Sequence, residues 1–372
     1  MPRQVPHGFT EWPKQSQELK PHEVVQMYDA GFSGCFLYEE EKEQIESELA
    51  QLNNGMMNAS DIAHASGFAD SGAGKLILLF LEAATTFPGC YPGPAQQRGD
   101  CVSHGGSGAA LLTLGGEITL GRPDPVTGII EGKPQLSEAG VKNSVISSEW
   151  NYWHRNHGGD GWQCAACVKV MLEQGIMLRQ PYPELSIDLT TYSGSLAGKY
   201  GRTAPPSNFQ VEGRKHIIRT ATPVNSAEAC RDMLYNRYGI IDCGSEGYAK
   251  TRDANGVSKR SGSWAHSMKE GGFDDRDVIK KLYNEPLVLI GNNWAVWNGG
   301  PRDIIDSAQF VPQALKEQWI AWDLVNPSTG NIMIPKGWFW TPWSQAKNRY
   351  RMAMSSINGW PSQKLPDYVS LI

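Results

Sequence analysis

The sequence predicts an α+β fold in which a helical lobe precedes a β-rich lobe. In the first part of the chain, residues 162–174 have the apolar spacing of a helix that ends at Gly175. From Ile240 onward the pattern changes to short apolar runs, at 287–290, 319–325 and 332–334, which Asn-Gly, Gly-Gly and Pro-Ser turns divide into strands. Two lobes of this kind leave a natural cleft between them, where we expect a functional site.

A boundary in the 372 residues lies at 88–94, which is too rich in proline and glycine to continue a helix or a strand. We assign 1–89 to an N-terminal extension of unknown role, 90–239 to the helical lobe and 240–372 to the β-rich lobe. The first half of the chain is then mostly helix and loop, and the second half is mostly strand.

The N-terminal extension carries two segments with helical spacing, 24–29 and 39–52, and the second is dense in glutamate. An acidic run on a helix is usually a solvated face, and less often a surface on which a protein partner docks. Assembly partners that bind through the extension therefore stay an open alternative.

Composition restricts the class of protein. Apolar residues make up 40% and charged residues 20%, which is typical of a globular chain. The 34 Lys and Arg against 39 Asp and Glu give a net charge of −5, so no broad basic surface is available for nucleic acid. The longest apolar run, 76–81, is far shorter than the about 20 residues of a membrane helix. Residues 1–18 lack the apolar core of a signal peptide, and we expect a cytoplasmic protein or one incorporated into a viral particle.

The sequence has seven cysteines, which are odd in number and widely spaced. This pattern does not indicate a small disulfide scaffold, and at least one thiol should be free. Cys101 follows the proline-rich break and precedes a segment of small residues, so we expect it at the start of a helix. The unpaired N–H groups and the dipole at a helix N-terminus favour an anion and lower a cysteine pKa. Cys101 is therefore a candidate nucleophile, although buried cysteine is also common as a small apolar residue.

Acyl transfer by a thiolate also needs an imidazole, a group that orients it and donors for the oxyanion. His266 lies in the β-rich half and is the candidate acid and base. Asn292 follows the apolar run 287–290, and its side-chain oxygen can accept a hydrogen bond from an imidazole. Trp294 is close enough in sequence to shield that bond from water.

These residues resemble the papain-like cysteine peptidase family in the order Gln, Cys, His, Asn. The tract 96–102 is similar to the family's Gln-Gly-x-x-Gly-x-Cys segment, and 291–294 is similar to its Asn-Ser-Trp-Gly segment. Between them, 157–160 followed by a helix and Pro181-Tyr182-Pro183 resembles the family's Asn-Gly-Gly turn, helix and Tyr-Pro-Tyr segment. The likeness spans about 96–298, with a weaker match at 335–344, and the first 89 residues match nothing that we can name.

The resemblance implies a papain-like two-lobe fold and a role for each residue. Cys101 would be the nucleophile, His266 the acid and base, and Asn292 the residue that orients the imidazole. Gln96 would donate its amide to the oxyanion beside the Cys101 N–H. Trp294 would cover the Asn292 contact, and Gly158 and Gly159 would line the groove where a substrate backbone pairs.

The sequence departs from the family pattern around the nucleophile. Gln96 stands five positions before Cys101 and Gln97 four, where the family normally has its glutamine six positions before, so the oxyanion donor could be either. Val102 replaces a tryptophan, and glycines at 105, 106 and 108 lie where the family has its central helix. Each costs about 1 kcal/mol against alanine in a helix, so they indicate either tight packing or a degenerate site. The separation from Cys101 to His266 exceeds the typical 130 to 150 or so, which requires insertions, expected at 117–147 and within 250–261.

Three functions follow from this reading. The first is a cysteine peptidase, a thiol protease that hydrolyses peptide or amide bonds of peptide or protein substrates and needs no cofactor or metal. The second is a papain-like scaffold with an assembly role, for example a virion structural protein. The third is a transglutaminase or cell-wall amidase, in which Asp274 or Asp275 would lie beside the His266 ring in place of Asn292.

Rival sites in the sequence have simpler explanations. His154, His157, Cys164 and Cys167 could ligate zinc, but the two cysteines stand one turn apart in an apolar helix and are expected to pack. Residues 72–75 lack the strand and the hydroxyl of a phosphate-binding loop. The aspartates at 274–277 lack the glycine and glutamate of a calcium loop.

Overall fold

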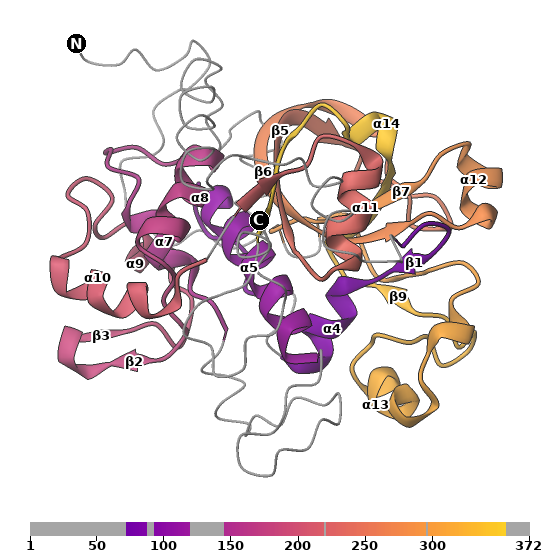
Figure 1. Cartoon of the computed structure of the whole chain (residues 1–372), viewed down its shortest axis with the longest axis horizontal. Coiled ribbons are helices and arrows are strands. Elements are labelled where there is room, and N and C mark those ends of the chain that lie inside the picture. Colours follow the sequence, from indigo (N-terminus) through magenta and orange to yellow (C-terminus); the bar gives the residue numbers. More distant parts are fainter. Residues whose placement is uncertain (1–71, 88–92, 120–144, 219–220, 295–296, 355–372) are drawn as a thin grey trace, which may run out of the picture.

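The computed structural model describes residues 72–87, 93–119, 145–218, 221–294 and 297–354. The predicted helices at 24–29 and 39–52 lie outside these residues, as does most of the insertion expected at 117–147. In Figure 1 helix α5 runs through the middle of the molecule, with helices α7 to α10 on one side of it and the large sheet on the other. Helices and an antiparallel sheet in one chain confirm the predicted α+β class.

The helices that lie before the sheet in sequence are mostly short, with one long exception. That exception is α5, which begins at Cys101 and ends at Thr119. The others in this part are α4 (Leu79–Thr86), α7 (Ser148–Trp153), α8 (Cys164–Glu173), α9 (Gly194–Ala197), α10 (Ser207–Gly213) and α11 (Ala227–Tyr235), with 3-10 turns η1 (Pro183–Leu185) and η2 (Arg214–His216). Later in the chain lie α12 (Asp277–Tyr283), η3 (Ala308–Phe310), η4 (Gln313–Leu315), α13 (Lys316–Ala321) and α14 (Trp343–Ala346).

The main sheet is antiparallel and has the strand order β10-β7-β6-β5-β11-β4, with β1 paired to β6. Its strands are β1 (Leu76–Ile77), β4 (Ala221–Pro223), β5 (Ile240–Tyr248), β6 (Arg260–Asp274), β7 (Leu287–Gly291), β10 (Trp338–Pro342) and β11 (Tyr350–Met354). Two small hairpins add β2 (Pro181–Tyr182) with β3 (Ile187–Asp188), and β8 (Arg302–Asp303) with β9 (Met333–Ile334). The long strand β6 lies at the centre of the sheet and carries His266.

Helix α5 packs against β6 at very short range, and its glycines permit this. A Cβ on Gly105 would collide with Ser267 Oγ and lie 2.7 Å from the Met268 carbonyl oxygen. A Cβ on Gly108 would lie 2.8 Å from Lys269 Cδ. Because backbone atoms in a strand cannot move aside as a side chain can, only glycine fits at position 105. Of the two explanations open from the sequence, close packing is therefore the one that the structure supports.

A disulfide joins the two parts of the molecule. Cys164, the first residue of α8, is bonded to Cys243 on β5, and both are fully buried. The sequence did not predict this pair. Cys101, Cys167 and Cys230 are free and buried, so the expectation of at least one free thiol is confirmed.

Other predicted elements can be compared directly. Helix α8 ends before Gly175, which has a φ of 71°, as expected for a glycine that terminates a helix. The predicted strand at 319–325 is wrong for most of its length, because Lys316–Ala321 is helix α13. Trp319 lies on this helix and is buried, and within 319–325 only Val325 forms a β-bridge, with Ile332. Apolar spacing in so short a run does not distinguish the two structures.

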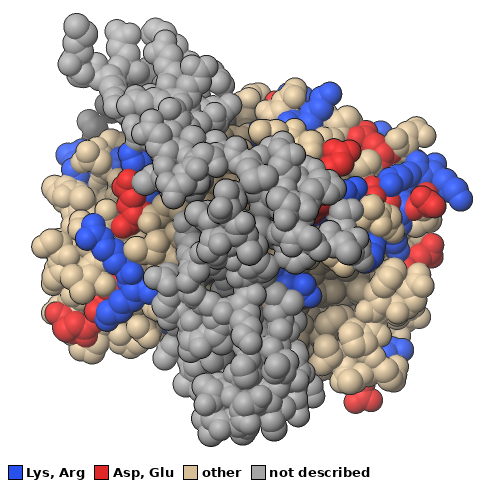
Figure 2. Space-filling model, in the orientation of Figure 1, with Lys and Arg blue, Asp and Glu red and all other residues tan. Residues whose placement is uncertain are grey.

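The buried apolar side chains form two clusters. The larger one extends from α4 and α5 into the sheet and also includes buried residues of α7 and α8. A second cluster lies among the short helices and consists of Trp150, Trp153, Met177, Tyr182, Leu189 and Phe209. Among the described residues no helix is both long and apolar enough to cross a membrane. The face shown in Figure 2 has Lys and Arg interspersed with Asp and Glu wherever residues are described.

Candidate active site

Cys101 is the first residue of α5, as the proline-rich break before it predicts. The carbonyl oxygen of Asp100 accepts the first backbone bond of the helix, from His104 N at 3.1 Å. The Cys101 side chain therefore lies at the positive end of a long helix dipole, which favours the thiolate. In this structure Cys101 has no exposed surface.

His266 and Asn292 are brought together by neighbouring strands. His266 lies on β6, and Asn292 directly follows β7, which pairs with β6. His266 Nε2 lies 3.1 Å from Asn292 Oδ1. The same oxygen accepts the Trp294 backbone N–H at 3.2 Å, which fixes the amide with its oxygen toward the ring. Because that oxygen can only accept, His266 Nε2 carries the proton and Nδ1 is the basic nitrogen.

Trp294 covers the contact between His266 and Asn292. Its ring centroid lies 4.2 Å from that of His266, with 33° between the planes, and its side chain is buried. Trp264 and Trp297 pack against Trp294 with centroids 4.9 Å and 6.0 Å away. This aromatic cluster excludes water from the hydrogen bond and strengthens it.

The residues expected beside the imidazole of a transglutaminase or amidase lie elsewhere. Asp274 pairs with Arg276, whose Nη2 is 2.7 Å away. Asp275 pairs with Lys280 at 2.8 Å and accepts the Gly74 backbone N–H. The neighbour of His266 Nε2 is thus Asn292, which is the arrangement that favours the peptidase interpretation.

Burial sets the protonation state of His266. Its pKa is lowered from 6.5 to about 3, mainly by loss of solvent; the bond to Asn292 opposes this shift, and the positive charges of Arg349 and Lys269 add to it. Arg349 donates to the His266 carbonyl oxygen at 3.4 Å and is paired with Asp242 at 2.5 Å. In this closed conformation the imidazole is neutral at pH 7.

The two glutamines before Cys101 point to different places. The Gln96 side chain is fully buried, and its backbone N–H donates to Asn293 O at 3.0 Å, beside the orienting loop. Its Nε2 donates to Arg98 O at 2.5 Å. The Gln97 side chain instead accepts the Gly194 N–H at 2.9 Å, at the start of α9. The role of Gln96 or Gln97 as oxyanion donor stays a prediction.

Gly158 and Gly159 are exposed and belong to a loop that is tied to the segment before Cys101. Gly161 N donates to Gly99 O at 2.8 Å, and Arg98 Nε donates to Asp160 Oδ1 at 2.9 Å. A Cβ on Gly158 would collide with the Arg202 guanidinium, whereas a Cβ on Gly159 would make only an ordinary contact, with His157 Nδ1 at 3.9 Å. The loop is therefore held beside the nucleophile, and the groove-lining role of the two glycines stays a prediction.

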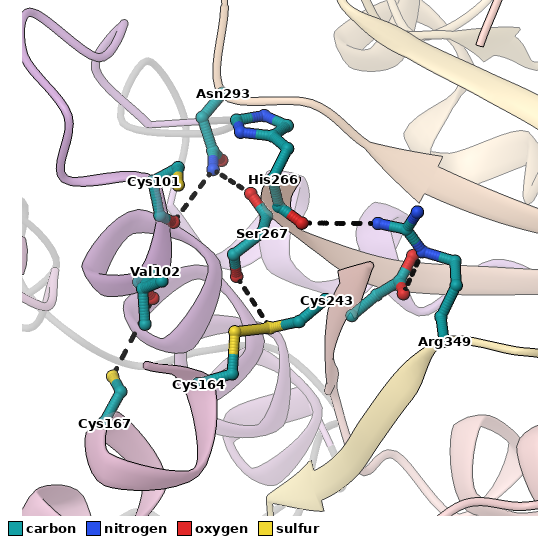
Figure 3. Close-up of a disulfide and its surroundings, with 10 residues drawn as sticks. Cys101, Val102, Cys164, Cys167, Cys243, His266, Ser267, Asn293 and Arg349 are labelled. Carbon is teal, nitrogen blue, oxygen red and sulfur yellow. Dashed lines mark hydrogen bonds and ion pairs between the residues drawn. A yellow bond between two sulfur atoms is a disulfide. The ribbon is translucent and has the colours of Figure 1, made fainter. Parts of the chain in front are cut away.

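Asn293 is a site residue that sequence reasoning missed. Its Nδ2 donates to Ser267 O at 3.0 Å on β6 and to Cys101 O at 3.4 Å on α5. Figure 3 shows this amide between the start of α5 and the part of β6 that carries His266. One side chain thus joins the two elements that carry the nucleophile and the imidazole. Its position beside Asn292 was the only sequence signal for it.

The zinc alternative fails on its ligands. Cys164 is bonded to Cys243 and cannot supply a thiolate. Cys167 Sγ instead lies 3.8 Å from Val102 O, inside the contact between α8 and α5. In the part of the chain that the structure describes, no group of three or more His, Cys, Asp or Glu side chains could hold a metal ion.

Comparison with known proteins gives matches among solved structures. No family model and no curated protein matches the sequence. Xylellain, a cysteine protease from Xylella fastidiosa, is 11% identical over 76% of this chain and 85% of its own, with a TM-score of 0.41. Procathepsin B from Trypanosoma congolense is 14% identical over 74% and 76%, with a TM-score of 0.40. A digestive procathepsin L 3 of Tenebrio molitor is 11% identical over 90% and 99%, with a TM-score of 0.37. The papain-like family recognised from the sequence is the one to which these structures belong.

Proposed function

We propose that this chain is a cysteine peptidase that hydrolyses peptide or amide bonds through the Cys101 thiolate. The observation that carries the proposal is the 3.1 Å contact of His266 Nε2 with Asn292 Oδ1 under the Trp294 ring, beside the end of α5 that begins with Cys101. An imidazole held by an amide in one tautomer is the base that a thiol nucleophile needs. The substrate is a peptide or protein.

Each group has one role in the reaction. His266 Nδ1 takes the Cys101 proton, and the sulfur attacks the scissile carbonyl carbon. The oxyanion that forms receives hydrogen bonds from the Cys101 backbone N–H and the Gln96 amide. Protonated His266 then gives its proton to the leaving amine, and an acyl-enzyme remains. Water activated by His266 attacks this thioester and restores the thiol. Asn292 holds the ring in position at every step.

The reaction requires that the site opens. Cys101 and His266 are fully buried, so a carbonyl carbon reaches the sulfur only after neighbouring atoms move. Opening also admits water, which removes the main cause of the low His266 pKa and lets the ring accept a proton. Substrate access and activation of the base are therefore coupled.

A peptidyl vinyl sulfone tests the assignment, because it alkylates an activated thiolate and the site can be mapped by mass spectrometry. We expect labelling at Cys101 that is lost in Cys101→Ala and falls by at least about 10³-fold in His266→Ala. Cys167→Ala is the matched control, because burial raises the pKa of the Cys167 thiol and keeps it inert. The rate at which each variant cleaves denatured casein should rank the variants in the same order as their labelling. If Cys101→Ala cleaves casein as fast as the wild type, the proposal is wrong.

The full burial of Cys101 and His266 favours a second candidate, a scaffold without catalysis. In that case the fold would serve assembly with other proteins, as in a viral particle. The same probe separates the two functions. A wild-type protein that stays unlabelled at Cys101 after hours with excess probe, while it remains folded, would favour the scaffold.

A further inference from the structure

Lys269 is a buried lysine that the proposed mechanism does not use, and burial lowers its pKa to about 7. It lies on β6, and its side chain is 3% exposed. Its Nζ donates to Asn293 Oδ1 at 2.7 Å and lies 5.5 Å from the centre of the Trp338 ring. A Cβ on Gly108 of α5 would meet the Lys269 stem, so the side chain passes directly over that helix. A lysine in such surroundings needs a reason, because burial of an ammonium group costs free energy.

The contacts of the Asn293 side chain agree on which way its amide faces. Lys269 Nζ donates to the amide oxygen. The Nδ2 atom is then turned toward the carbonyl oxygens of Ser267 and Cys101, at 3.0 Å and 3.4 Å. Without a donor at the Lys269 position, the buried amide oxygen loses this hydrogen bond, and the amide is held only through its Nδ2 and its backbone.

The Asn293 backbone adds a third connection. Its carbonyl oxygen accepts the Gln96 N–H at 3.0 Å, which fixes the segment expected to supply the oxyanion donor. Asn293 therefore contacts three segments that the proposed chemistry requires to be in register: the Cys101 carbonyl, the strand residue next to His266, and Gln96. Misplacement of reacting groups by about 1 Å can cost about 10²-fold in rate.

We propose that Lys269 is a positioning residue, which fixes the Asn293 amide so that this amide holds the first turn of α5 against β6 and Cys101 opposite His266. The role rests on the proposed function, since it serves the reactivity of Cys101. Lys269 acts through Asn293 and touches no reacting atom.

The experiment measures the rate at which iodoacetamide alkylates Cys101, mapped by mass spectrometry, in the full chain. Lys269→Met keeps the volume and removes the donor, and we expect labelling at least tenfold slower. Lys280→Met is the matched control, because it removes a partly exposed lysine paired with Asp275, far from Asn293 in the chain, and should label like the wild type. Asn293→Asp keeps an acceptor for Lys269 but loses the N–H donors, so it should be as slow as Lys269→Met.

Two further measurements separate positioning from a merely structural role. Lys269→Met is expected to unfold at the same temperature as the wild type or higher, because a buried ammonium is gone, while Cys101 reacts more slowly. Lys269→Arg, which keeps a cationic donor, is expected to regain part of the rate. A merely structural residue would lose stability and reactivity together and would gain nothing from arginine.

The outcomes also separate this role from the proposed function. If wild-type Cys101 is labelled and Lys269→Met is labelled equally fast, the positioning role is overturned and the nucleophile stands. If wild-type Cys101 does not react at all, the proposed function and this role both fail. Slow labelling in Lys269→Met and Asn293→Asp with an unchanged Lys280→Met supports the role.

Discussion

Gly105→Ala tests the close packing that places Cys101 against the sheet. In an exposed helix this substitution would stabilise by about 1 kcal/mol, because alanine is the better helix former. Here the new Cβ would collide with Ser267 Oγ and lie 2.7 Å from the Met268 carbonyl oxygen, both on the central strand. Overpacking of this kind costs about 1 to 3 kcal/mol. We therefore expect Gly105→Ala to be destabilised by about 1 to 2 kcal/mol, against the helix propensity.

Urea denaturation followed by tryptophan fluorescence measures this free energy of unfolding. Gly108→Ala is the comparison within the same helix, because the new Cβ meets the flexible stem of Lys269 at 2.8 Å and not backbone, so its cost should be smaller. Gly300→Ala is the control for open space, since nothing lies within 4 Å of the added carbon, and it should change stability by less than about 0.5 kcal/mol.

Reactivity of Cys101 should fall with stability in Gly105→Ala, because the helix must move away from β6 by a fraction of an ångström. A loss of up to about 10²-fold in alkylation rate is expected for a displacement near 1 Å. If Gly105→Ala is more stable than the wild type, propensity dominates and helix α5 does not approach the strand as closely as the structure shows.

Three other changes test separate features. The free energy of unfolding should fall by up to about 5 kcal/mol between pH 6.5 and pH 3, because His266 has a pKa of about 6.5 in the unfolded chain, whereas burial holds it near 3 in the folded protein. Urea titrations at each pH measure this fall, which should be smaller in His266→Gln. Cys243→Ser removes the disulfide between residues 79 apart and should lower the free energy of unfolding by about 4 kcal/mol in the same assay. Under reducing conditions, where the wild type also lacks the disulfide, the variant and the wild type should be equally stable. Arg349→Leu leaves Asp242 charged and unpaired in the interior and should cost about 3 to 5 kcal/mol, whereas a loss below 1 kcal/mol would mean that the pair does not form.

The parts of the site that the sequence predicts correctly are those with a local cause. Cys101 starts a helix because prolines and glycines before it prevent regular structure, and Gly175 ends α8 because glycine adopts a positive φ without strain. The pairing of His266 with Asn292 was predicted from the chemistry of the two side chains and from the resemblance to a family, without a structural cause. The structure supplies its cause, which is the pairing of β6 with β7.

The parts that the sequence does not predict depend on contacts between distant residues. Any of seven cysteines could pair, and only the fold brings Cys164 of α8 to Cys243 of β5. Lys269 has the sequence context of an exposed strand residue, yet α5 covers it because of the glycines in that helix. The strand prediction at 319–325 is wrong for a local reason: the run is too short for its apolar spacing to distinguish a strand from helix α13.

The charges around the candidate site explain why it should be inactive while closed. Burial is the main cause of the low pKa of His266, and Arg349 and Lys269 lower it too, so a proton on the ring costs most while the site is closed. The N-terminal end of α5 favours a thiolate at Cys101. A thiolate with a neutral imidazole cannot supply the acid that the leaving amine needs, whereas a thiol with a neutral imidazole is a poor nucleophile. Water entering an opened site screens the cations and lets the ring take the thiol proton, so opening itself switches on both halves of the proposed chemistry.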